Sequence, residues 1–293
     1  MIAGVGVSTH PRGRDATGEV IGQVLERFGD DPDLALLFVA GHDDELSEIA
    51  GAVRAMLSPA VLVGSTARTV VGGAREFEGR PAIALLAVRA PGSRAVRIGT
   101  RQVERGTRLD GLDPSVLADA HSLILLSDPF SFPTAAVLDH LGRRHSHLTV
   151  VGAMTSASRQ PGGNRLLLDD TVETDGAVAV ALGGGVSLDT VVSPACRPIG
   201  EPFTVTDADG PRLRGLGGRP ATDRLRELLA GLEPRERSLA TMGLHAGRVV
   251  DEQRASFGSG DFVIRNIRGI DRDDGAIVVG ERVPVGAIFQ FQL

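Results

Sequence analysis

The chain contains one apolar segment twice, as Ala35-Leu36-Leu37-Phe38 and, 88 residues further on, as Leu123-Ile124-Leu125-Leu126. The segment that follows it recurs at the same spacing, since Val151-Gly152-Ala153 lies 88 residues after Val63-Gly64-Ser65. Recurrence of several strings in the same order is the signature of an internal repeat. The sequence therefore predicts a duplicated structural unit.

The later part of the repeated unit is spaced more widely. Gly162-Gly163-Asn164-Arg165 follows Gly72-Gly73-Ala74-Arg75 by 90 residues, and residues 177–182 follow residues 82–87 by 95. Loops accept a few inserted residues at little entropic cost, so the growing offset is consistent with insertions between strands. We predict two copies of a β-α-β-β-β unit, at about residues 30–100 and 118–192.

The pattern of apolar residues supports the predicted β-α-β-β-β units. The stripe Leu46, Ile49, Val53 and Leu57 falls on one face of a helix, after a continuous apolar run at residues 34–40 that is typical of a buried strand. We predict an α+β (mixed αβ) fold. Its two tandem repeats form mixed, largely antiparallel sheets covered by helices within residues 1–192, and a smaller αβ region covers residues 193–293.

Composition limits the chemistry of the chain. All 31 basic residues among the 293 are Arg, and Trp and Tyr are absent, which excludes a lysine Schiff base, a phosphate-loop lysine and tyrosine proton transfer. A net charge of -6 with few aromatic residues gives nucleic acid no obvious surface to hold. Neither an apolar run of about 18 residues nor a signal peptide is evident. We expect a cytoplasmic protein that binds a small molecule, with a separate signalling protein as a second candidate partner, but no nucleic acid or membrane.

The turns after two buried strands are candidate ligand-binding sites. The first contains Gly64, Ser65 and Thr66, and the second contains Gly152, Ala153 and Thr155. Backbone N–H groups and hydroxyls at strand ends bind carboxylates, and glycine permits close approach. The alternative is that glycine only supports a tight turn.

Other candidate ligand contacts lie in loops. Arg165 can clamp a carboxylate with two parallel hydrogen bonds, with the amide of Asn164 beside it, or can be a solvated hairpin residue. Asp128 and Ser131 lie between a buried strand and a helix, where α/β proteins often bind ligands, but Ser131 could equally cap that helix. Arg197 follows the single cysteine, Cys196.

Two further chemistries stay open. Cys196 beside Arg197 could be a nucleophile in acyl or amide transfer, or an inert core residue. His42 and His245 each follow a predicted apolar strand and could ligate haem in a gas sensor, or could make ordinary polar contacts. The histidines show no metal-binding spacing, so we expect no metal and no resident cofactor.

Several strings together resemble the FIST family of sensory domains. The most specific is Cys196-Arg197-Pro198-Ile199-Gly200. The others are residues 33–38, 61–66, 127–133, 151–153, 162–170, 202–206, 265–267 and 269–271.

The resemblance implies an N-terminal FIST domain over residues 1–192 and a C-terminal FIST domain over 193–293. It also implies a cytoplasmic sensory module for signal transduction, whose ligand is an amino acid or a related small metabolite; some members look like haem-binding nitric-oxide sensors. FIST C-terminal portions typically continue beyond the strand that residues 287–293 resemble, so this one looks truncated. From the residues we expect the ligand in a crevice between the repeats and the C-terminal region.

Overall fold

The chain forms two compact units in a computed structural model, Met1–Thr190 and Val191–Leu293. The structure describes residues 2–103, 106–112, 114–117, 120–183, 185–191, 196–254, 256–258, 260–271 and 273–293. The predicted boundary between residues 192 and 193, and the predicted start of the second repeat at residue 118, lie outside the described residues. Each unit has its own hydrophobic core and is described by itself.

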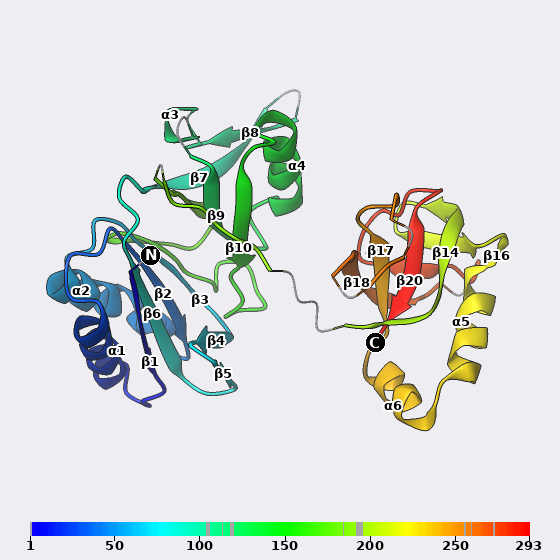
Figure 1. The fold of residues 1–293 in the computed structure, drawn as a ribbon, viewed down its shortest axis with the longest axis horizontal. Coiled ribbons are helices and arrows are strands. Elements are labelled where there is room, and N and C mark those ends of the chain that lie inside the picture. The colour runs from blue at the N-terminus through cyan, green and yellow to red at the C-terminus, as the bar shows by residue number, and fades with distance from the viewer. Residues whose placement is uncertain are drawn as a thin grey trace. The chain divides into compact units, whose positions relative to one another are not determined.

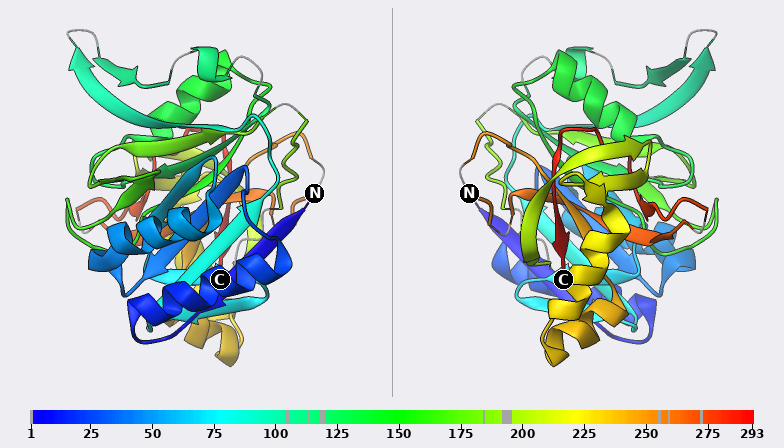
Figure 2. Two further views of the ribbon diagram at one scale, coloured as in Figure 1. Left: turned by 90° about the vertical axis from the view of Figure 1, so that its left-hand side faces the viewer. Right: turned by 90° about the vertical axis from the view of Figure 1, so that its right-hand side faces the viewer.

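The first unit contains a six-stranded sheet, called sheet 1, in the order β1-β6-β2-β3-β11-β12. Two helices cover one of its faces (Figures 1 and 2). The apolar stripe predicted for α2 packs on this face, since Leu46, Ile49, Val53 and Leu57 are all buried there. The elements are β1 (Ala3–Ser8), α1 (Gly13–Arg27), β2 (Leu34–Ala40), η1 (Asp43–Glu45), α2 (Leu46–Leu57), β3 (Leu62–Thr66), β6 (Ala82–Val88), β11 (Leu166–Leu168) and β12 (Thr171–Glu173).

The second sheet of this unit, called sheet 2, has the order β10-β9-β13-β7-β8. Its outer face packs on α4 through Val137 and Leu141. Its inner face packs on sheet 1, where Leu34 and Leu36 meet Val178 and Val180 in one cluster. The unit is thus layered as helices, sheet 1, sheet 2 and helix (Figure 1). The elements are β7 (Arg94–Val103), β8 (Gly106–Asp110), α3 (Pro114–Leu117), β9 (Ser122–Ser127), α4 (Thr134–Arg144), β10 (Thr149–Met154) and β13 (Ala177–Ala181).

Strand registers reveal the duplication in detail. Leu37 pairs with Gly64 in the parallel β2–β3 ladder, and the residues 88 positions later, Leu125 and Gly152, pair in the same way in β9–β10. The antiparallel ladders pair Leu37 with Leu85 and Leu125 with Ala179. The last strands of the two copies therefore correspond at an offset of 94, not the 95 taken from the sequence. A slip of one residue would exchange the two faces of the strand.

The two copies differ in where their hairpins go. In the first, β4 (Thr69–Gly72) and β5 (Arg75–Glu78) form a separate two-stranded sheet. In the second, β11 and β12 leave sheet 2 and extend sheet 1, because Leu167 pairs with Gly64 of β3. The second copy thus covers the edge strand of the first, and β10 forms an outer edge of sheet 2 among the described residues.

The antiparallel strands of the second unit form a closed sheet, which is called the ring below. The pairing order β14-β20-β17-β18-β19-β15 returns to β14 through a β14–β15 ladder. The long strand β14 bends at a bulge between Ile199 and Phe203, where Gly200 has φ of +64°. Phe289 and Phe291 are buried inside the ring. The elements are β14 (Pro198–Asp209), β15 (Arg212–Leu216), β16 (Arg219–Pro220), α5 (Ala221–Gly231), α6 (Pro234–Met242), β17 (His245–Val249), β18 (Phe262–Ile270), β19 (Ile277–Val279) and β20 (Ile288–Gln292). Both units mix helices with mainly antiparallel sheets, so the predicted α+β class is confirmed.

Candidate functional site

The two glycines predicted at strand ends lie inside strands. A Cβ on Gly64 would run into the carbonyl oxygen of Leu37, and a Cβ on Gly152 into that of Leu125. Neighbouring backbone therefore fills the space on that side of each glycine. The close approach of paired strands is enough to explain both residues.

The first strand end is tied to Arg165 of the second repeat. Ser65 and Thr66 are buried. The backbone N–H of Thr66 donates to the carbonyl oxygen of Arg165 at 3.0 Å, and the N–H of Arg165 donates to the Thr66 hydroxyl at 2.9 Å. The guanidinium of Arg165 turns back to the carbonyl oxygens of Gly162 and Asn164, at 2.8 and 2.9 Å. The described hydrogen bonds of the Arg165 guanidinium therefore stay within its own loop, whereas its backbone binds Thr66.

Asp128 is the centre of a buried hydrogen-bond network. Its Oδ2 accepts from the N–H of Phe130, the N–H of Ser131 and the hydroxyl of Ser131 at 3.1, 2.9 and 2.7 Å. Its Oδ1 accepts from the amide of Asn164 at 2.9 Å. Burial raises the pKa of Asp128, but these hydrogen bonds outweigh burial and hold the pKa below its usual value. The carboxylate therefore organises the loop between β9 and α4.

The network brings together five of the predicted residues: Thr66, Asp128, Ser131, Asn164 and Arg165. Asn164 bonds to Asp128 of the second repeat, while the backbone of Arg165 bonds to Thr66 of the first. The dipeptide Asn164–Arg165 therefore links the strand ends of the two repeats through hydrogen bonds.

The other predicted residues do not belong to this hydrogen-bond network. Ala153 is exposed on β10, and Thr155 is buried with its hydroxyl unpaired among the described residues. Cys196 and Arg197 belong to the second unit, where Cys196 is a partly exposed free thiol. Arg197 forms an ion pair with Glu236 at 2.6 Å.

The two histidines proposed as haem ligands lie in different units. His42 is buried in the first, with Nε2 at 3.3 Å from the carbonyl oxygen of His10 and Nδ1 at 3.4 Å from Oε1 of Glu45. Both ring nitrogens thus have protein partners, and iron ligation at His42 would displace one of them. His245 begins β17, and its buried Nδ1 is unpaired among the described residues.

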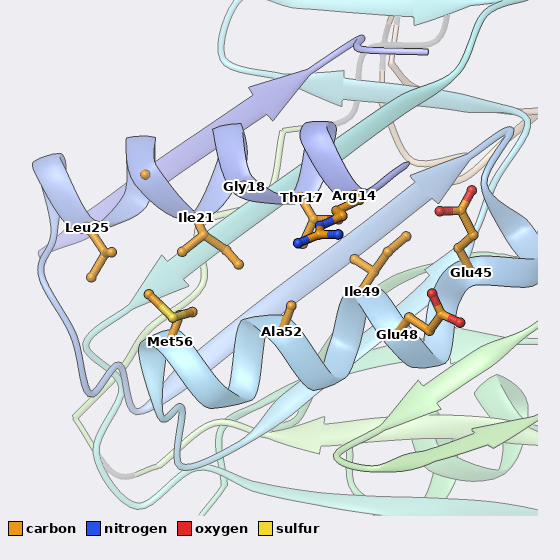
Figure 3. A pocket seen from close by; sticks show the side chains of 11 residues that line it. Arg14, Thr17, Gly18, Ile21, Leu25, Glu45, Glu48, Ile49, Ala52 and Met56 are labelled. Atoms are coloured by element: carbon orange, nitrogen blue, oxygen red, sulfur yellow. The ribbon is translucent and has the colours of Figure 1, made fainter. Parts of the chain in front are cut away.

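A groove that the sequence did not indicate runs between α1 and α2 (Figure 3). It encloses about 440 Å³. Its floor is apolar, with Ile21 and Ile49 buried at its base. The lining residues are Arg14, Thr17, Gly18, Ile21, Gly22 and Leu25 from α1, and Glu45, Glu48, Ile49, Ala52 and Met56 from η1 and α2.

Charges of both signs gather toward one end of the groove. Figure 3 shows Arg14 reaching over it from α1, with Glu45 and Glu48 on the η1–α2 side and with Leu25 and Met56 toward the opposite end. Arg14 and Glu48 form no hydrogen bond or ion pair with any residue that the structure describes. Glu45 lies against Gly13 at the N-terminus of α1, where the helix dipole favours an anion, and faces His42.

Two glycines of α1 line the groove without side chains that would narrow it. Gly18 and Gly22 lie in the interior of α1, and a Cβ on either would meet no atom within 4 Å. An exposed glycine in a helix interior costs about 1 kcal/mol relative to alanine. Packing does not require these glycines, whereas an open groove does. The spacing of Gly18 and Gly22 is visible in the sequence, but the groove also depends on the separation of two helices.

The described part of the chain contains neither a metal-binding cluster nor a membrane-spanning helix. Among those residues, no cluster of three or more His, Cys, Asp or Glu side chains could hold a metal ion. Within the same residues, every helix is too short or too polar to cross a membrane.

Comparison with known proteins identifies relatives along the whole chain. An uncharacterized protein of Mycobacterium tuberculosis strain ATCC 25618 / H37Rv, Rv0628c, is 42% identical over 301 residues, covering 100% of this chain and 76% of the relative. An uncharacterized protein of Mycobacterium bovis strain ATCC BAA-935 / AF2122/97, Mb0898c, is 41% identical over 302 residues with the same coverage.

Two family models match in tandem, the FIST N domain at residues 33–219 and the FIST C domain at residues 221–293. The first match extends past the compact first unit and includes β14 to β15 of the second. FIST domains are associated with sensory signal transduction. The chain therefore belongs to the FIST family, as the resemblance of its sequence strings implied.

Proposed function

We propose that this protein is a sensory module that binds a small zwitterion, an apolar amino acid or a related metabolite, in the groove between α1 and α2. The observation that carries the proposal is Arg14, which has no partner among the described residues and lies near Glu45 and Glu48 on an apolar groove that Gly18 and Gly22 leave open. A cytoplasmic location stays a prediction.

The charges favour a zwitterion over a simple anion. The guanidinium of Arg14 can hold a carboxylate through two parallel hydrogen bonds. The carboxylates of Glu45 and Glu48 can accept hydrogen bonds from an ammonium group at the same end. The apolar side chain of the ligand would then cover the floor formed by Ile21 and Ile49. An anion without an ammonium group would bring a further negative charge to these carboxylates and would donate no hydrogen bond to them.

The size of the groove agrees with this ligand class. Small-molecule sites are concave, mostly apolar and usually of about 300–1,000 Å³, with a few polar groups that fix orientation. The groove of about 440 Å³ lies within that range. We further propose that the hydrogen-bond network of Thr66, Asp128, Ser131, Asn164 and Arg165 has a structural role and holds the two repeats together. Its hydrogen bonds join protein groups to one another.

Calorimetric titration with three matched compounds tests the proposal. Leucine carries both charges, 4-methylpentanoate lacks the ammonium group, and 3-methylbutylamine lacks the carboxylate. We expect leucine to bind more tightly than either, because each analogue leaves one side of the charged end unpaired. At a concentration of 100 times its Kd, a ligand stabilises the folded state by about 2.7 kcal/mol, so thermal unfolding provides a second readout.

Substitutions at the charged end make the test specific. Arg14→Gln should remove the preference for leucine over 3-methylbutylamine, and Glu48→Gln should reduce the preference over 4-methylpentanoate. Arg68→Gln and Glu26→Gln are matched controls, because both residues are exposed and lie outside the groove. Equal affinity for all three compounds, or loss of leucine binding in the controls alone, would rule out the proposed recognition.

A further inference from the structure

The equivalent strands β3 and β10 of the two repeats differ in whether their outer edge is paired. The outer edge of β3 in the first repeat is covered by β11 of the second repeat, which pairs with it as an antiparallel strand. In the second repeat, β10 pairs with β9, and its other edge faces no described strand (Figure 1). Gly152, Ala153 and Met154 are exposed there, and Met154 is 56% exposed.

The covered edge identifies which backbone groups of the open edge are available. On β3, the carbonyl oxygen of Leu62 accepts from the N–H of Asp169 at 2.7 Å, and the N–H of Thr66 donates to Arg165 at 3.0 Å. The positions 88 residues later are 150 and 154. Thr149 at the start of β10 and Thr155 directly after its end direct their N–H groups to the β9 side, at 2.9 Å from the carbonyl oxygens of His121 and Ser127.

The backbone N–H and C=O groups of successive residues in a strand point to opposite sides. Those of Val150, Gly152 and Met154 therefore face the open edge. Natural sheets usually protect an edge strand with charged residues, proline or a bulge. The segment 149–154 contains neither a charged residue nor proline, and its register with β9 is continuous. An uninterrupted apolar edge of this kind is suited to strand addition.

The charges beside the two edges suggest the chemistry of the added strand. After its three leucines, β11 continues into Asp169 and Asp170, and Arg54 near the end of α2 holds both, at 3.2 and 2.8 Å. The equivalent helix α4 ends in Arg143 and Arg144, which are exposed and form no ion pair with a described residue. The open edge thus has the cations of the covered edge without their acidic partners.

We propose that β10 is the docking site for an extended segment of a partner protein, which adds to sheet 2 as an antiparallel strand. The segment is apolar over about three residues and acidic immediately after them. Its backbone pairs with Val150, Gly152 and Met154, and its acidic residues bind Arg143 and Arg144. A second copy of β10 fits less well, because residues 145–160 contain no acidic side chain that could pair with these cations.

The probe is a fluorescent peptide with the sequence of residues 164–173 of this chain, which has the required pattern. We expect it to bind the full chain and to slow amide hydrogen exchange at residues 150, 152 and 154. Replacing both aspartates of the peptide by asparagine should weaken binding and reduce its salt dependence. The variant Arg143→Gln, Arg144→Gln should have the same effect.

A pair of substitutions at one position separates pairing from side-chain contact. Met154→Pro removes an outward N–H at the end of an edge strand, where proline is tolerated, whereas Met154→Ala keeps it. We expect about a tenfold loss of affinity for the proline variant, which matches the upper range for one backbone hydrogen bond, and little change for the alanine variant. Circular dichroism checks that both fold.

Three results would overturn the proposal. One is that the amides of residues 150, 152 and 154 are already protected in the free full chain. Another is that the peptide protects only residues 62–66, which would mean that it displaces β11. The third is a concentration-dependent dimer that Met154→Pro abolishes, which would assign the edge to a second copy.

Discussion

Replacing the two glycines of α1 that line the groove should raise the stability of the protein and lower its affinity for the proposed ligand. Gly18 and Gly22 lie in the interior of α1, and a Cβ on either has open space. Alanine at an exposed helical position is about 0.8–1.0 kcal/mol more favourable than glycine. The double substitution Gly18→Ala, Gly22→Ala should therefore stabilise the protein by about 2 kcal/mol, or roughly 4–8 °C in Tm for a unit of this size.

The same two methyl groups enter the groove that we propose as the ligand site. The affinity for leucine should fall by at least about tenfold, equivalent to 1.4 kcal/mol. Gly51→Ala is the matched control, because Gly51 is exposed on α2, has open space around its Cβ position and does not line the groove. It should raise Tm by half as much and leave affinity unchanged.

Thermal unfolding by circular dichroism and calorimetric titration of the same samples provide both numbers. A double variant that gains stability and still binds leucine with the original affinity would show that the groove is not the site. A double variant that loses stability would show that the space around Gly18 and Gly22 is not open, and the geometric argument would fail as well.

Three other substitutions test the packing and the electrostatics. Gly64→Ala should destabilise the protein by about 1–3 kcal/mol, because its Cβ meets the carbonyl oxygen of Leu37 and strands cannot part locally without strain; chemical denaturation measures this loss, and a neutral effect would refute the packing role. Asp128→Ala should cost about 3 kcal/mol or more, since four donors lose their buried acceptor. Because the pKa of Asp128 is lowered in the folded state, its contribution is present above about pH 4 and disappears as the pH falls through the folded pKa. Denaturation of both proteins from pH 2 to pH 7 should show the difference shrinking in acid, and a pH-independent difference would contradict it. Asp43→Asn should instead raise Tm at pH 7: burial, and then Asp44, raise the pKa of Asp43, so ionisation favours the unfolded chain as the pH rises from the unfolded towards the folded pKa. That gain should vanish below about pH 4, and a gain that persists in acid would exclude this cause.

The sequence predicted the duplicated fold because both copies carry the same strings in the same order. The helical stripe of α2 follows from hydrophobic periodicity, and the strands that contain residues 34–40 and 123–126 follow from continuous apolar runs. The offset of 95 for the last strand was wrong by one residue, since a run of small apolar residues such as 177–181 aligns equally well in either register. Only the pairing of Ala179 with Leu125 fixes it.

The exchange of β11 into sheet 1 could not be predicted from local sequence. Three consecutive leucines are compatible with burial on both faces of either sheet. What selects sheet 1 is the long-range fit of Asp169 to Arg54 and to the N–H of Leu62, at 3.2 and 3.0 Å, and these partners lie more than 100 residues away.

The candidate site was harder to predict than the fold. The strand ends drew attention because they combine glycine, hydroxyl and charged residues, and the structure does bring Thr66, Asp128, Ser131, Asn164 and Arg165 together. Their polar atoms are largely satisfied by one another, which a list of residue types cannot reveal. The groove of Arg14, Glu45 and Glu48 could not be predicted, because its charges come from separate helical segments and the spacing of Gly18 and Gly22 alone does not show how far apart the helices lie.

Amide chemical-shift mapping of the full chain during a leucine titration tests the proposed ligand site most directly. The glycine signals fall in a distinct region of the spectrum, so Gly18 and Gly22 serve as reporters. We predict saturable shifts at Gly18, Gly22 and Ala52, with little change at Gly152 or Asn164. Saturable shifts confined to Gly152, Asn164 and their neighbours, or no shift at any residue, would contradict the account.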